Sequence, residues 1–166
     1  MNFYESLDLA SPSAAIDTFS DAFARNDFMT VWLVLDRQAQ FAAEQHINLL
    51  QYGNLIRRDD VPSIGAEVSS VYDLDGLETS DRWNMFSQFM MIGDDHDAYL
   101  IDLSGEVTLG DESLVGEHTE VVTAVEGIEG DVLFRLTQSP SGKWRVNQVI
   151  VPGGDEDMIP WSVPQK

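Results

Sequence analysis

The residues best suited to chemistry in this chain are a histidine and a glutamate two positions apart. His118 and Glu120 stand in the β-prone run HTEVVTAVE, where residues two apart share one face of a strand. A carboxylate beside an imidazole can orient it and tune it as a base near neutral pH. The pair therefore predicts an acid/base site, and the alternative is that both side chains lie on the water-facing side of a sheet.

Three residues on neighbouring runs extend this candidate site. Tyr99 offers a hydroxyl donor, Asp102 a second carboxylate and Arg135 an anion clamp. An isomerase or dehydratase pocket that works without a cofactor needs such a set. We predict Asp102 as a catalytic residue beside the histidine and glutamate, and Tyr99 and Arg135 as ligand-binding residues.

Two acidic segments have the composition of metal sites, but neither predicts one. Residues 94 to 97 read DDHD and offer an imidazole and three carboxylates. Adjacent residues rarely converge on one ion, so a solvated turn is the better interpretation. In DLDG at 73 to 76, Gly76 would be the sixth residue of a calcium loop, which makes Val71 the first ligand and Arg82 the twelfth. We predict no metal site.

Missing residues and motifs exclude several enzyme classes. The chain has no cysteine, and therefore no disulfide, thiolate nucleophile or cysteine-ligated zinc. Dinucleotide-binding, P-loop, nucleophile-elbow and zinc-protease patterns are absent as well. We predict no cofactor.

A cluster of soft apolar side chains is a candidate ligand wall. Three methionines and two phenylalanines cluster in the run MFSQFMM at 85 to 91, and methionine adapts readily to irregular ligands. Phe86 and Met90 of this run, together with Trp32, are predicted to contact a ligand, and ordinary core packing is the alternative.

Charge limits the partners of the protein. Twenty-nine acidic residues stand against nine lysines and arginines, for a net charge of -20. Such a chain repels phosphates, so we expect neither nucleic acid nor an acidic membrane surface as a partner. The dispersed acids indicate either a solvated exterior or an acidic face that docks a basic protein.

The elements that must position these residues begin with helices. Ser11 is a good N-cap and Pro12 suits the first helical position, and the helix should end near Asn26. Its apolar residues recur at helical spacing, while Asp17 and Asp21 point the other way. The run FMTVWLVLD after the cap residue at position 27 fits either a helix or a buried strand. Further helices are predicted over 37–52 and from about 80 to 93.

Short β-rich runs separated by turn residues follow. They predict an antiparallel meander after the helices, which is an α+β fold. We expect N-terminal helices packed on a strongly bent antiparallel sheet of four to six strands, in a single domain over 1–152 with an extended arm over 153–166. The runs are AYLIDLS, EVTL, HTEVVTAVE, DVLFRLTQ and KWRVNQVIV, with breaks at 104–105, 110–111, 127–130 and 139–142.

The two ends of this α+β chain resemble a known superfamily. SPSAAIDTFSDAFARND followed by FMTVWLVLD, with SGKWRVNQVIVP on the last strand, is similar to the nuclear-transport-factor-like superfamily, the cystatin-like α+β cone. The resemblance implies a bent sheet wrapped on a long helix, with a pocket between them. Its members include isomerases, dehydratases, epoxide hydrolases, ligand-binding domains and dimerisation modules, so the fold alone does not choose a function.

Three functions fit these observations. The first is a non-catalytic domain that binds a small apolar ligand or a partner in the pocket between helices and curved sheet, and self-associates as a homodimer. The second is a cofactor-free lyase or isomerase, and the third is an acidic inhibitor or immunity-type protein that binds a basic partner. The N-terminus has no basic and apolar signal pattern, and no 18 apolar residues run together, so a cytoplasmic location is expected.

Overall fold

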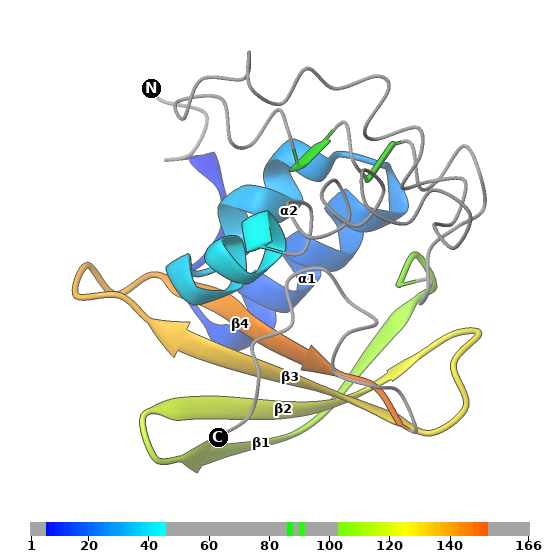
Figure 1. The fold of residues 1–166 in the computed structure, drawn as a ribbon. Helices are drawn as coiled ribbons and strands as arrows, with labels where there is room; N and C mark the ends of the chain where they lie inside the picture. The colour runs from blue at the N-terminus through cyan, green and yellow to red at the C-terminus, as the bar shows by residue number, and fades with distance from the viewer. Residues whose placement is uncertain (1–5, 46–85, 88–89, 92–102, 153–166) are drawn as a thin grey trace.

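The fold places helices before strands along the chain. The computed structural model describes residues 6–45, 86–87, 90–91 and 103–152. In this part of the chain three helices are followed by a four-stranded antiparallel sheet that is not closed, which confirms the α+β class (Figure 1). The elements are α1 (Pro12–Ala24), α2 (Phe28–Val34), a helix over 37–45, β1 (Val107–Val115), β2 (His118–Val125), β3 (Asp131–Gln138) and β4 (Trp144–Ile150).

Helix α1 begins and ends where the sequence predicts. The Ser11 hydroxyl accepts a hydrogen bond from the Ala14 backbone N–H at 3.1 Å, and Pro12 occupies the first turn, where its missing N–H costs nothing. The helix stops before Asn26, whose φ of 56° lies in the left-handed region that ends a helix. The N-cap and the end of this helix are confirmed.

The run that fits either a helix or a strand forms a helix. The Asp27 carboxylate caps α2 by accepting from the Thr30 backbone N–H at 3.3 Å and from its hydroxyl at 2.7 Å. After seven helical residues the chain becomes extended at Leu35, which forms a parallel bridge with Val146 of β4. The helix interpretation of the apolar run is therefore confirmed, and contact with the sheet is limited to the bridge at Leu35.

Each strand of the sheet pairs with the next in sequence, in the order β1-β2-β3-β4. The predicted turns at 127–130 and 139–142 connect β2 to β3 and β3 to β4. The predicted break at Gly110 is wrong. Leu109 pairs with Thr123 and Glu112 with Val121, so the break is a bulge inside one strand. A Cβ at Gly110 would lie 2.8 Å from the Val122 carbonyl oxygen, which is why glycine stands there.

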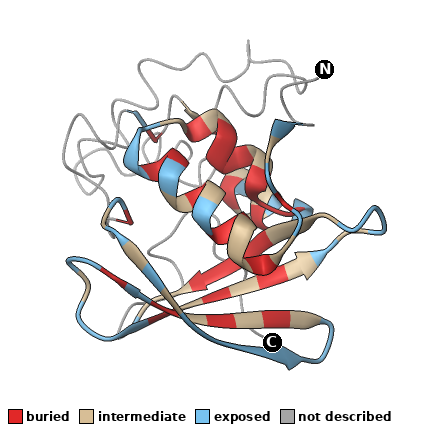
Figure 2. Ribbon diagram, turned by 180° about the vertical axis from the view of Figure 1, so that it is seen from behind, coloured by how far each residue is buried: buried red, intermediate tan, exposed pale blue. Residues whose placement is uncertain are grey.

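The core lies between the helices and one face of the sheet (Figure 2). Alternate residues of β3 are buried, and the Phe134 ring packs edge-on against Phe19 of α1, with centroids 5.7 Å apart. Helix α1 packs against α2, β4 and β1. The alternation predicted for β3 is confirmed, and it fixes which face of each strand points toward the helices.

One buried carboxylate joins the helices to the sheet. The Asp36 Oδ1 atom accepts from the Ala39 backbone N–H at 2.9 Å and so caps the helix over 37–45. Its Oδ2 atom accepts from Asn147 Nδ2 at 2.7 Å and from the Thr137 hydroxyl at 2.9 Å. Since Asp36 is buried, water does not replace these bonds when they are lost.

We expect Asp36→Ala to lower the free energy of unfolding by about 3 kcal/mol, because a helix cap is lost, the Thr137 hydroxyl loses its acceptor and Asn147 Nδ2 keeps only Gln38 Oε1. Urea unfolding followed by circular dichroism measures this loss. The matched control is Asp131→Ala at an exposed position of β3, where a change within about 0.5 kcal/mol is expected. A loss below about 1 kcal/mol for Asp36→Ala would contradict the role of this carboxylate.

Candidate functional site

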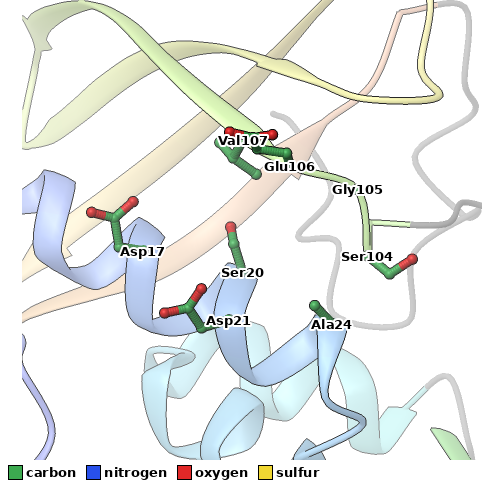
Figure 3. A pocket seen from close by; sticks show the side chains of 8 residues that line it. All are labelled: Asp17, Ser20, Asp21, Ala24, Ser104, Gly105, Glu106 and Val107. Atoms are coloured by element: carbon green, nitrogen blue, oxygen red, sulfur yellow. The ribbon is translucent and has the colours of Figure 1, made fainter.

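An acidic pocket lies between α1 and the segment that enters β1 (Figure 3). It has a volume of about 360 Å³. Both walls come from described elements, and each contributes carboxylates. We define the acidic pocket by Asp17, Ser20 and Asp21 of α1 and by Gly105, Glu106 and Val107 of the opposite wall.

The α1 wall results from the amphipathic pattern of that helix. Its apolar residues are buried in the core, and Asp17 and Asp21 are four positions apart among its exposed residues. Both are exposed, and Figure 3 shows their carboxylates on the side of the helix that faces the β1 segment. Helical geometry therefore places the two charges one turn apart along one wall of the pocket.

The opposite wall is held in place by a close approach of two backbones. A Cβ at Gly105 would clash with the Glu126 carbonyl oxygen, so only glycine allows the chain to pass there. The next residue is tied down as well, because the Glu126 backbone N–H donates to the Glu106 carbonyl oxygen at 2.9 Å. These two constraints fix the backbone from which the Glu106 carboxylate projects.

Among the described residues, the acidic pocket holds negative charge without a counter-ion. Within the described ranges the carboxylates of Asp17, Asp21 and Glu106 form no ion pair. The nearest guanidinium group on the same helix, that of Arg25, donates through Nε to the Asp21 backbone oxygen at 3.2 Å rather than to the carboxylate. The described part of the chain also contains no group of three side chains close enough to hold one metal ion.

A buried hydroxyl group lies in the same wall. The Ser20 Oγ atom is buried and has no hydrogen-bond partner. Figure 3 shows this hydroxyl group pointing away from the helix, toward the chain at Val107. A buried hydroxyl group without a partner costs free energy, so Ser20 destabilises the wall that it belongs to.

The predicted acid/base residues lie on the other face of the sheet. His118 and Glu120 alternate with the buried residues of β2, so both point away from the helices. The structure brings Glu120 and Arg135 together, with Nη2 2.8 Å from Oε1, and Arg135 Nη1 also donates to Gln148 at 3.3 Å. Within the described residues, His118 makes no hydrogen bond to Glu120 or Arg135. Its catalytic role stays a prediction.

The same sheet face carries a second arginine. Arg145 pairs in register with Thr137, and burial lowers the pKa of its guanidinium because desolvation disfavours the charged form. Between the polar residues lie half-buried apolar ones, Val122, Leu133 and Ile150, which are in register across β2, β3 and β4. Self-association through this sheet stays a prediction.

The predicted ligand wall belongs to the core. Phe86 is fully buried and Met90 and Trp32 are 2% and 6% exposed, and the Trp32 and Phe86 rings lie with centroids 5.2 Å apart. Trp32 also lines a second pocket of about 290 Å³ beside Phe41. Tyr99 and Asp102, the two remaining predicted site residues, lie outside the described residues.

Sequence reasoning placed Asp17 and Asp21 on the solvent side of α1 and assigned them no role. The spacing of four between two acids was visible in the sequence, and so was the acid at the start of the first strand. The packing of β1 against α1 was not visible in the sequence, and this packing brings the three carboxylates to one pocket.

Comparisons with models of known protein families, with curated proteins and with solved structures found no match. The resemblance to the nuclear-transport-factor-like superfamily therefore stays a prediction. In the part of the chain that the structure describes, no helix is both long and apolar enough to cross a membrane.

Two serine-to-alanine changes in the same helix should have opposite effects. Ser11→Ala removes the N-cap and should destabilise the protein by about 1 kcal/mol. Ser20→Ala removes a buried hydroxyl group without a partner and should stabilise it by about 0.5 to 1 kcal/mol. Thermal and urea unfolding of both variants measure these changes. Destabilisation by Ser20→Ala would show that its hydroxyl group is satisfied in solution.

Proposed function

We propose that this protein is a non-catalytic binding domain whose acidic pocket accepts a cationic group of a basic partner protein. The observation that carries the proposal is the meeting of three carboxylates, from Asp17, Asp21 and Glu106, that form no ion pair with any residue that the structure describes. The net charge of -20 adds long-range attraction for a basic partner.

Electrostatics explains why a cation fits here better than a neutral ligand. Like charges that line one pocket repel each other, and a bound guanidinium or ammonium group replaces this repulsion with attraction. A guanidinium group presents five N–H donors, which suits acceptors on two walls better than a single point charge does. Arginine is therefore the side chain that we expect in the pocket.

The walls of the acidic pocket favour binding over catalysis. The described residues of these walls supply carboxylates and hydroxyl groups but no imidazole, thiol or amine. The carboxylates accept no hydrogen bond from a group that could orient them for proton transfer, within the described residues. The lyase or isomerase hypothesis depends instead on His118 and stays a prediction. A small apolar ligand suits this pocket less well than a cation, because its rim is charged.

A hexaarginine peptide is the probe for this proposal, with affinity measured by isothermal titration calorimetry. The double variant Asp21→Asn/Glu106→Gln removes one charge from each wall at nearly constant shape. We expect its affinity to fall about tenfold or more, since hydrogen bonds to charged groups contribute about 1.5–3 kcal/mol each. Added salt should weaken binding to the unmodified protein.

The control variant Glu129→Gln/Asp131→Asn makes the same change of net charge at exposed positions of the β2–β3 connection and the start of β3. It should retain the affinity of the unmodified protein to within about threefold, because only general attraction is reduced. An equal loss in the two double variants would contradict the proposal, since binding would then depend on total charge. No binding of the probe at low salt would contradict it as well.

A further inference from the structure

The strand that leaves the acidic pocket has an open edge. β1 is the first strand in the sheet order and pairs only with β2. Within the described residues, no backbone group on its other edge makes a hydrogen bond. Alternate residues of β1 direct their N–H and C=O groups to this edge and thus offer unpaired donors and acceptors, which is the arrangement that an added strand can use.

The charge along this edge selects the strand that could pair with it. The segment 104–117 contains four acidic residues, Glu106, Asp111, Glu112 and Glu117, and no basic residue. Glu112 pairs with buried Val121, so it lies on the face of the sheet that points toward α1, as Val107 does at the acidic pocket. One face of β1 therefore carries Val107 at the acidic pocket and the Glu112 carboxylate five positions further along.

We propose that the basic partner adds an extended segment to the open edge of β1 and places an arginine or lysine side chain in the acidic pocket. This inference rests on the proposed function and deepens it. In a strand, alternate side chains share one face, so basic residues at alternate positions would meet the pocket and Glu112 together. An extended segment of seven residues spans about 23 Å, which is enough to reach from the acidic pocket to Glu112.

A second copy of this chain is a poor occupant of the same edge. Pairing β1 with itself would bring carboxylates from two chains of net charge -20 together, and like charges on adjacent strands destabilise a sheet. Acidic residues and a bulge at an edge strand are common devices against self-pairing. The charges that prevent pairing with a copy are the charges that favour a basic segment.

The exposed apolar residues at the end of β1 provide the remaining contact. The side chains of Leu114 and Val115 are 77% and 49% exposed beside the turn to β2. Leu114 lies on the same face as Glu112, and Val115 on the opposite face. A segment in which arginine alternates with an apolar residue matches this distribution of charge and apolar surface.

The test uses a seven-residue peptide of alternating arginine and valine and two N-methylated isomers. One isomer is methylated at three arginines and the other at the three valines, so they have equal charge and equal numbers of methyl groups. The N–H groups of alternate strand residues point to opposite edges. One isomer therefore loses the N–H groups that would pair with β1, and the other keeps them.

We expect the affinities of the two isomers to differ at least about tenfold, because up to three backbone hydrogen bonds are lost in only one of them. The peptide without methyl groups should also slow hydrogen exchange of amides in β1. Equal affinities of the isomers would overturn strand addition. If the isomers bind equally and the affinity of both still falls in the variant Asp21→Asn/Glu106→Gln, the proposal of cation binding in the acidic pocket holds and only strand addition to β1 is wrong. No binding of any peptide would overturn both proposals.

Discussion

The arrangement of helices and sheet depends on the Asp36 carboxylate, which is hydrogen-bonded to both. It caps the helix over 37–45 and binds side chains of β3 and β4 at the same time. The neighbouring Leu35 adds a backbone bridge to Val146. Because α1 packs on both α2 and the sheet, these contacts of Asp36 and Leu35 help to set where α1 lies relative to β1. The acidic pocket has one wall in each of these two layers, so its shape depends on how they are joined.

Local patterns predicted most of the described fold because each had a local cause. The Ser11 hydroxyl and the Asp27 carboxylate each accept a hydrogen bond from a backbone N–H three residues further along the chain. The alternation in β3 is likewise a pattern within eight consecutive residues. The prediction failed at Gly110, where a turn signal belongs to a bulge. A glycine that permits a close backbone approach and a glycine that ends a strand look the same in a sequence.

The candidate site was harder to predict than the fold, because it depends on contacts distant in sequence. Asp21 and Glu106 are 85 positions apart, and only the packing of α1 on β1 makes them neighbours of one pocket. Glu120 and Arg135 were both predicted as site residues but not as a pair, and the register of β2 and β3 brings them together. The high acidity of the sequence therefore does not locate a binding site, whereas the positions of a few carboxylates beside the open edge of β1 do indicate one.

The central claim is that cations bind at one place on this acidic protein and not over its whole surface. The most direct measurement is a titration with hexaarginine followed by NMR chemical-shift changes of the backbone amides. The account predicts that the largest changes fall on 17–24 and 104–107, the residues around the acidic pocket. Changes spread over all exposed acids, or centred on the face that carries Glu120 and Arg135, would contradict it.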